Sequence, residues 1–178
     1  AAPSVTLSEQ KTIEKYLQIK SGNYFDVLNG YIAEGDSITA GYYGTGQVGY
    51  AQKVMNSVSP RFGNQLTSAV SGSYIAGVSG RISAVQAKIN AMLAIGVHPI
   101  VSLLIGANDR PSTLLEAQTL YNSITTYCDA IKGYGASFIL CTTTATDPST
   151  YVLYESTGRP ELNRLIREND CGADAVCD

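Results

Sequence analysis

The sequence contains no tryptophan and only one histidine, His98, among its 178 residues. No Cys-x-x-C pair is present either, so the usual ligand spacings of a zinc site are missing. We therefore expect neither a metal nor another cofactor. The scarcity of histidine also bears on catalysis, because a serine nucleophile normally needs a histidine to take its proton.

Charge and long apolar runs are also scarce. Charged residues make up 15% of the chain, and 12 basic against 15 acidic side chains give a net charge of −3. The basic residues are scattered, so we expect no nucleic-acid partner. No apolar run approaches the ~18 residues that a membrane span needs. The hydrophobic content of 44% favours a globular chain, and we expect one domain over residues 1–178.

Cellular location and redox state stay open at this point. No secretory signal is present, while the opening Ala1–Val5 fits a mature terminus after signal cleavage, as in a secreted protein, and equally a trimmed chain. Cys141 and Cys177 fall in apolar, strand-like runs. We interpret the four cysteines, which include Cys128 and Cys171, as buried or idle thiols. The alternative is a Cys171–Cys177 disulfide in an exported protein.

Hydrophobic periodicity predicts strands alternating with helices along the whole chain. The expected strands cover residues 31–34, 65–70, 99–105, 137–142 and 173–178. The expected helices cover residues 7–20, 49–58, 82–93 and 117–131, and a further helix contains Leu162, Leu165 and Ile166. This alternation indicates an α/β fold with a parallel sheet of about five strands and helices on both faces. Such sheets bind ligands at the carboxyl ends of their strands.

Three polar motifs follow three successive predicted strands. They are Gly35-Asp36-Ser37-Ile38-Thr39, Val70-Ser71-Gly72-Ser73 and Gly106-Ala107-Asn108-Asp109. Each motif alone has an ordinary structural explanation, as a helix N-cap, a turn glycine or a turn pair. Together they are expected to meet at one edge of the sheet. A serine nucleophile and an oxyanion site made of the Ser37 N–H, the Gly72 N–H and the Asn108 amide could be built from them.

These motifs, in this order and each after a strand, resemble the SGNH (GDSL-type) serine hydrolases from about residue 30 to the end. The resemblance implies a flavodoxin-like, three-layer α/β/α sandwich. It implies that Ser37 is the nucleophile and that Gly72 and Asn108 donate to the oxyanion. The implied activity is hydrolysis of an ester, whose substrate is a small molecule, a carbohydrate or a lipid. Nothing in the sequence chooses among these substrates, and nothing addresses the oligomeric state.

The chain departs from the family at the motif that supplies the base. The family's Asp-x-x-His, expected after the fifth strand, does not occur anywhere in the sequence. His98 cannot replace it, because it precedes the third strand, and Pro99–Ile105 would span roughly 23 Å between it and the site. We therefore expect the domain to end before its last catalytic motif and the base to lie beyond Asp178. The alternative function is a non-catalytic binding module that retains the fold without its base.

Three further features have ordinary interpretations. Gly44–Gly49 match G-x-G-x-x-G but do not directly follow a strand, so a flexible loop is expected rather than a dinucleotide site. An unrelated flavodoxin-like binding domain is disfavoured by the absence of a phosphate-loop pattern. Five tyrosines near the motifs either line a substrate pocket or lie on the surface: Tyr42, Tyr43, Tyr74, Tyr151 and Tyr154. Asp36 is expected to brace the Ser37 turn, and Asp109 to pair with Arg110.

Overall fold

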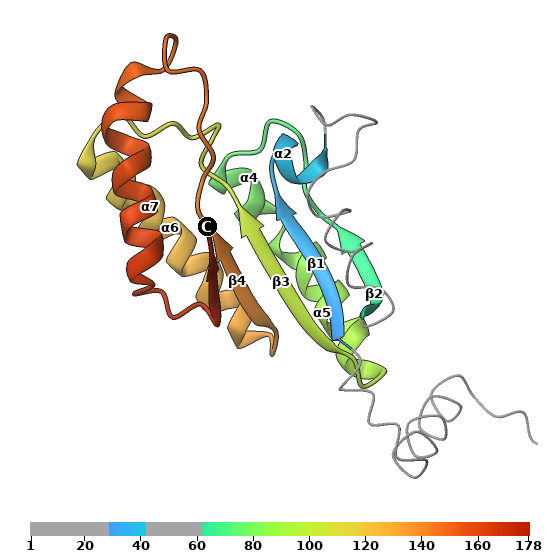
Figure 1. The fold of residues 1–178 in the computed structure, drawn as a ribbon. Helices are drawn as coiled ribbons and strands as arrows, with labels where there is room; N and C mark the ends of the chain where they lie inside the picture. The colour runs from blue at the N-terminus through green and yellow to red at the C-terminus, as the bar shows by residue number, and fades with distance from the viewer. Residues whose placement is uncertain (1–28, 42–61) are drawn as a thin grey trace, which may run out of the picture.

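A computed structural model of the protein describes residues 29–41 and 62–178. Its centre is a five-stranded parallel sheet in the order β2-β1-β3-β4-β5. The strands are β1 (Asn29–Gly35), β2 (Phe62–Thr67), β3 (His98–Leu104), β4 (Ser137–Cys141) and β5 (Ala175–Cys177). This confirms the expected α/β fold with a parallel sheet. Figure 1 shows β1 and β3 ending at the side of the sheet where α2 (Ser37–Ala40) and α4 (Ile75–Gly80) lie.

The connections between strands determine where a ligand site can form. Helices α4 and α5 (Ile82–Ala94) link β2 to β3, and α6 (Leu114–Gly133) links β3 to β4. The π-helical turn η2 (Tyr154–Gly158) and α7 (Arg159–Glu168) link β4 to β5. Because the chain runs from β1 to β2 on one side and then crosses to β3 on the other, the strand order reverses at β1. Open parallel sheets bind ligands at such a reversal, beyond the carboxyl ends of the strands.

Helix α6 shows how local sequence sets an element that supports the site. Its N-cap, Thr113, accepts a hydrogen bond from the Glu116 N–H at 3.1 Å, and the Glu116 carboxylate accepts one from the Ser112 N–H at 2.7 Å. The predicted apolar stripe faces inward: Ala117, Leu120, Tyr121, Ile124, Cys128 and Ile131 are all buried. The cap at Thr113, five residues after Asn108, fixes where α6 begins.

One core joins the helices to the sheet. Alternate strand residues pack with α4, α5, α6 and α7 in a single apolar cluster: Ile32, Val101, Leu103, Phe138 and Leu140. Since side chains alternate across a strand, Glu34 in β1 lies on the same side as Ile32. Glu34 has no exposed surface. The carboxylate of Glu34 is thus buried near the carboxyl end of β1, on the side of the sheet that carries the apolar cluster.

Several elements differ from the sequence-based expectations. The second strand covers Phe62–Thr67 instead of residues 65–70, because its paired register with β1 ends at Ala33↔Thr67. The short α4 was not predicted, since its N-cap Tyr74 makes no side-chain capping bond that would signal a helix start. The π-helical turn η2 was also missed. The predicted helices at residues 7–20 and 49–58 lie outside the described residues.

The cysteines differ from one another in exposure. Cys128, Cys141 and Cys171 are buried, as interpreted from the sequence. Cys177 is a free cysteine like the others, but it is exposed, so of the buried or idle thiols expected from the sequence it is not one of the buried ones. The reason is that β5 is the edge strand of the sheet, and only one of its sides pairs with a neighbour. Within the described residues, no disulfide links Cys171 to Cys177.

Candidate active site

The turn that carries Ser37 begins where β1 ends. Gly35 has φ +151°, and a side chain there would meet the Leu104 carbonyl oxygen at 2.3 Å, so only glycine fits. Asp36 is the N-cap of α2, and its Oδ1 accepts a hydrogen bond from the Ile38 N–H at 2.9 Å. This confirms that Asp36 braces the turn. Ser37 is the first residue of α2 and is half-buried, directly after the carboxyl end of β1.

The loop after β2 lies against the end of β1. The Val70 N–H donates to the Gly35 carbonyl at 3.2 Å, which brings the chain alongside the Ser37 turn. Gly72 then adopts φ +77°, a conformation that side chains other than glycine rarely accept. A Cβ at Gly72 would meet no atom of the described residues within 4 Å. No group of residues 29–41 or 62–178 therefore crowds the backbone at Gly72.

The loop after β3 joins the loop after β2 directly. Asn108 Nδ2 donates to the Ser73 carbonyl at 3.1 Å, and the Ile75 N–H donates to Asp109 Oδ1 at 3.0 Å. An amide nitrogen has two hydrogens, so the bond to Ser73 leaves the second hydrogen of Asn108 for a ligand. Two of the three sequence motifs, those with Gly72 and Asn108, therefore meet. That the Ser37 hydroxyl faces the same point stays a prediction.

Two carboxylates lie beneath this edge of the sheet. Burial raises the pKa of Asp36, and the Ile38 N–H opposes that rise. Burial likewise raises the pKa of Asp109, with the charge of Asp36 adding to the rise and the Ile75 N–H opposing it. The expected Asp109–Arg110 ion pair is wrong. Asp109 turns toward α4, whereas the Arg110 guanidinium lies 3.8 Å from the centre of the Tyr151 ring.

The single histidine lies at the other end of the sheet. His98 is the first residue of β3 and is in register with Asn29, the first residue of β1, whereas Ser37 follows the last. Its Nε2 is 2.8 Å from the Ser137 Oγ at the start of β4. The expectation that His98 lies at the wrong edge to serve Ser37 is confirmed.

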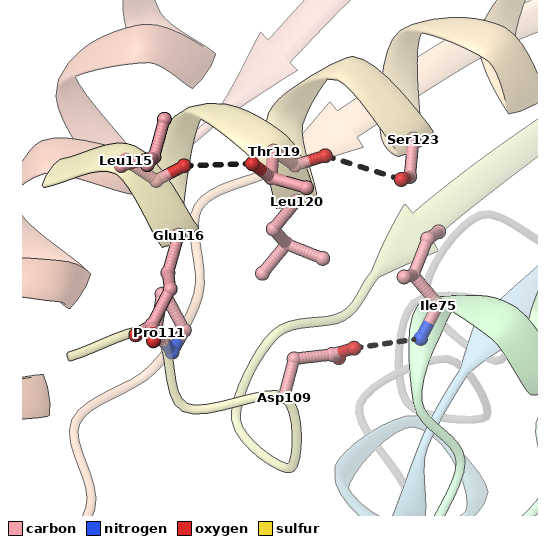
Figure 2. A pocket seen from close by; sticks show the side chains of 8 residues that line it. All are labelled: Ile75, Asp109, Pro111, Leu115, Glu116, Thr119, Leu120 and Ser123. Carbon is pink, nitrogen blue, oxygen red and sulfur yellow. Dashed lines mark hydrogen bonds between the residues drawn. The ribbon is translucent and has the colours of Figure 1, made fainter. Parts of the chain in front are cut away.

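A cavity of about 370 Å³ adjoins the Asn108–Asp109 turn. Figure 2 shows the lining residues between the start of α4 and the first turns of α6, with the Asp109–Ile75 hydrogen bond among them. Apolar walls alternate with a few polar groups, the composition of many small-molecule sites. The lining comprises Ile75, Pro111, Leu115 and Leu120, together with Asp109, Glu116, Thr119 and Ser123. Of the five tyrosines considered from the sequence, the three that the structure describes, Tyr74, Tyr151 and Tyr154, do not line it.

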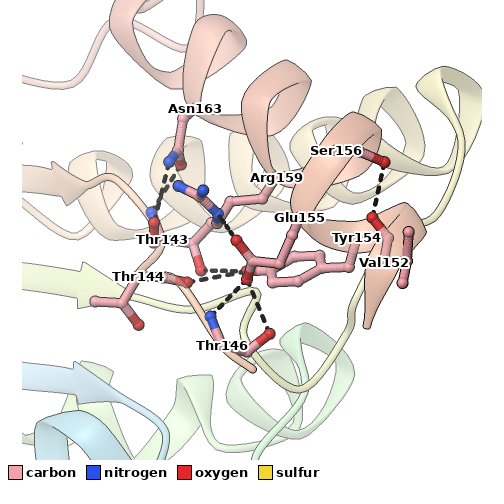
Figure 3. A network of polar contacts seen from close by, with 9 residues as sticks. All are labelled: Thr143, Thr144, Thr146, Val152, Tyr154, Glu155, Ser156, Arg159 and Asn163. Carbon is pink, nitrogen blue, oxygen red and sulfur yellow. Dashed lines mark hydrogen bonds and ion pairs between the residues drawn. The ribbon is translucent and has the colours of Figure 1, made fainter. Parts of the chain in front are cut away.

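Those tyrosines have other positions. Tyr74 is exposed, Tyr151 packs under Arg110, and Tyr154 is buried. Tyr42 and Tyr43 lie outside the described residues, as does the glycine-rich segment 44–49. In Figure 3 the Tyr154 hydroxyl points to Thr143, from whose Oγ1 it lies 3.0 Å.

A buried network that sequence reasoning missed anchors the segment after β4. Asn163 on α7 makes two hydrogen bonds to the backbone of Thr143: the Thr143 N–H donates to Oδ1 at 2.8 Å, and Nδ2 donates to the carbonyl at 3.0 Å. Glu155 accepts from Thr146 Oγ1 at 2.9 Å and pairs with Arg159 at 2.8 Å (Figure 3). The only signal in the sequence was a polar Asn163 within the apolar stripe of α7.

The described part of the chain contains neither a metal-binding cluster nor a membrane-spanning helix. No group of three or more His, Cys, Asp or Glu side chains is arranged to hold a metal ion there. Within residues 29–41 and 62–178, no helix has the length and apolarity needed to span a bilayer.

Comparison with known proteins points to one family. The model of the GDSL-like Lipase/Acylhydrolase family matches residues 33–170. No curated protein matches the chain. Similar solved structures include TesA, with a TM-score of 0.61 and 17% identity over 83% of this chain and 77% of TesA. AlinE4, an SGNH-hydrolase family esterase, has a TM-score of 0.59 and 18% identity over 83% of this chain and 75% of its own.

A third similar structure is that of an esterase in an inhibited form. The psychrotrophic esterase EstA from Pseudoalteromonas sp., described as inhibited by monoethylphosphonate, has a TM-score of 0.57 and 16% identity over 83% of this chain and 76% of EstA. At these identities the likeness concerns the fold, and it agrees with the fold expected from the sequence motifs.

Proposed function

The chain belongs to the GDSL-like lipase/acylhydrolase family, and from this premise we propose that it hydrolyses carboxylic esters with Ser37 as the nucleophile. The single observation that best supports the proposal is the 3.1 Å hydrogen bond from Asn108 to the Ser73 carbonyl. It joins the loops after β2 and β3 at the edge of the sheet where the Ser37 turn begins. Acyl transfer through a serine requires a nucleophile beside hydrogen-bond donors, which here are the Ser37 hydroxyl, the Gly72 N–H and the Asn108 amide.

In the proposed reaction the Ser37 hydroxyl oxygen attacks the carbonyl carbon of the ester. The carbonyl oxygen takes up negative charge, which the Ser37 N–H, the Gly72 N–H and the free hydrogen of the Asn108 amide stabilise. The C–O bond then breaks, and the alcohol leaves with the proton that a base has taken from the Ser37 hydroxyl. A water molecule attacks the acyl-enzyme by the same route, releases the acid and restores Ser37.

Substrate binding is proposed at the cavity beside Asp109. Its walls from Ile75, Leu115 and Leu120 would cover the apolar part of an ester, and the polar groups of Thr119 and Ser123 lie at its side (Figure 2). Burial of apolar surface contributes roughly 25 cal/mol per Å² to such binding. The cavity favours an ester with an apolar group of moderate size and does not select between carbohydrate and lipid alcohols.

The proton of Ser37 needs an acceptor, and the only histidine of these 178 residues is at the opposite edge of the sheet. General-base assistance is worth about 10²–10⁴ in rate. We therefore propose that the chain by itself turns over slowly. The same observation favours a second candidate function, a binding module that retains the pocket and does no chemistry.

The test uses the 178-residue chain with p-nitrophenyl acetate, with and without imidazole as a base supplied from solution. We expect weak hydrolysis alone and a faster, saturable reaction with imidazole that Ser37→Ala abolishes. The Ser37→Ala protein also serves as the control for hydrolysis by imidazole itself. A fluorophosphonate should label Ser37, as read by mass spectrometry of the peptide that contains it.

The outcomes separate the two candidate functions. Imidazole-supported turnover that is equal in wild type and Ser37→Ala, together with no label on Ser37, would refute the hydrolase and favour the binding module. Strong Ser37-dependent turnover without imidazole would show that another group within the chain acts as the base.

A further inference from the structure

The buried carboxylate of Glu34 is out of place in the apolar core. It lies in β1 three residues before Ser37 and has no exposed surface. Burial raises its pKa, while the nearby Arg81 lowers it. A buried carboxylate is costly unless a partner and hydrogen bonds compensate for the lost water. Packing alone would favour an apolar residue at this position.

Arg81 is the partner, and it contacts more than Glu34. This residue lies between α4 and α5, and its Nη2 is 3.1 Å from Glu34 Oε2. Its Nη1 donates to Ser73 Oγ at 2.9 Å and to the Gly77 carbonyl at 3.1 Å, and Nη2 donates to the Gly35 carbonyl at 3.5 Å. The planar guanidinium, with five donors in a fixed geometry, suits such a junction.

Ser73 continues the chain of contacts to the third loop. Its hydroxyl accepts from Arg81, and its carbonyl accepts from Asn108 at 3.1 Å. Ser73 itself is only 7% exposed. These contacts run from Glu34 through Arg81 and Ser73 to Asn108, and we call this series the contact chain. It links the ends of β1, β2 and β3.

We propose that Glu34 and Arg81 are positioning residues, which hold the Gly72 N–H and the Asn108 amide in the orientation that an oxyanion requires. This inference rests on the proposed function. The two residues act through Ser73 and do not touch the reacting atoms. Donors aimed at developing charge stabilise the transition state more than the bound substrate, so their misplacement lowers kcat and leaves KM nearly unchanged.

Three substitutions divide the contact chain at different points. Ser73→Ala removes the hydroxyl that meets Arg81 and keeps the ion pair. Arg81→Gln removes the guanidinium, and Glu34→Gln removes the charge of its partner at nearly constant volume. Arg164→Gln is the control, because Arg164 makes ion pairs of its own, with Glu161 and Glu168, on the exposed side of α7.

The first measurement is hydrogen exchange of peptides from residues 69–77, compared with peptides from α6. We expect Ser73→Ala and Arg81→Gln each to speed exchange in residues 69–77 about tenfold and to leave α6 protected, because local opening differs from global unfolding. The double variant should exchange no faster than Arg81→Gln alone. Arg164→Gln should match wild type in both regions.

The second measurement is imidazole-supported hydrolysis. Each of the three variants should lower kcat about 10- to 100-fold, less than the full loss of a donor, with KM within about threefold. Arg81→Lys should restore little, since a single ammonium does not reproduce the bridge from Glu34 to Ser73.

Exchange in residues 69–77 that stays at the wild-type rate in Ser73→Ala, or that rises equally in α6, would overturn the proposal. The exchange rate of Ser73→Ala tests the proposal even if Arg81→Gln and Glu34→Gln fail to fold. Failure of the proposed function has a different signature: no Ser37 labelling and no Ser37-dependent turnover in wild type. The exchange data then still show whether the contact chain orders the loop.

Discussion

Replacing Gly158 by alanine tests the packing of the Asn108 loop against η2. Gly158 has helical angles, φ −69° and ψ −47°, so helix propensity alone predicts that alanine stabilises the protein by up to about 1 kcal/mol. The tertiary structure predicts the opposite. A Cβ at Gly158 would lie 1.6 Å from the Pro111 carbonyl oxygen and 2.4 Å from its carbon.

The size of the effect follows from these distances. Cβ atoms essentially never approach another heavy atom within 3.0 Å, so the Pro111 carbonyl and η2 would have to separate by at least about 1.4 Å. Both partners are backbone, and neither can yield by a change of rotamer. Overpacking typically costs about 1–3 kcal/mol, which exceeds the gain in propensity. A net loss of about 2 kcal/mol would lower Tm by roughly 4–8 °C in a chain of this size.

The assay is thermal unfolding followed by circular dichroism, with Gly133→Ala as the matched control. Gly133 ends α6, and a Cβ there would meet no atom of the described part of the chain within 4 Å, so alanine should leave Tm unchanged or raise it by up to about 4 °C. Pro111 lies three residues after Asn108, so Gly158→Ala should also slow the labelling of Ser37. A Gly158→Ala protein as stable as wild type, beside a normal control, would refute this packing.

Three further predictions follow from the described contacts. Asn163→Ala leaves the Thr143 N–H and carbonyl buried without their partner, so the free energy of unfolding from urea titration should fall by about 2–4 kcal/mol; a loss below about 1 kcal/mol would contradict the network in Figure 3. His98→Ala should leave imidazole-supported hydrolysis within about threefold of wild type, whereas a loss beyond ~100-fold in a folded protein would show that the ring serves Ser37. Asp109→Asn keeps the oxygen that accepts from the Ile75 N–H and removes a carboxyl whose pKa is raised. With a raised pKa the folded state holds the proton more tightly than the unfolded state, so wild type loses stability as pH rises from about the ordinary value of 3.8 through the raised pKa. The Tm of Asp109→Asn relative to wild type should therefore be higher near pH 7.5 than near pH 4, and an equal difference at both would contradict the burial of the charge.

Local patterns in the sequence were enough to predict the alternation of strands and helices. The apolar stripe from Ala117 to Ile131 predicted α6. The apolar run over residues 99–105, directly after His98, predicted β3. Such patterns are readable because burial of apolar side chains repeats with the period of a helix or a strand. Parallel strands end at one edge, so the order of the three motifs also predicted that Gly72 and Asn108 meet.

The contacts that organise that edge were decided by the tertiary structure. Glu34 and Arg81 are 47 residues apart, and Asn108 and Ser73 are 35 apart. One feature of the sequence indicated an unusual buried charge: Glu34 interrupts an apolar strand directly before the Gly35-Asp36-Ser37 turn. Its partner could not be read from spacing, because Arg81 reaches it only through the crossover from β2 to β3. The fit of Gly158 against Pro111 has the same origin: periodicity records which side of an element is buried, while the atom that packs against it depends on strand order and register.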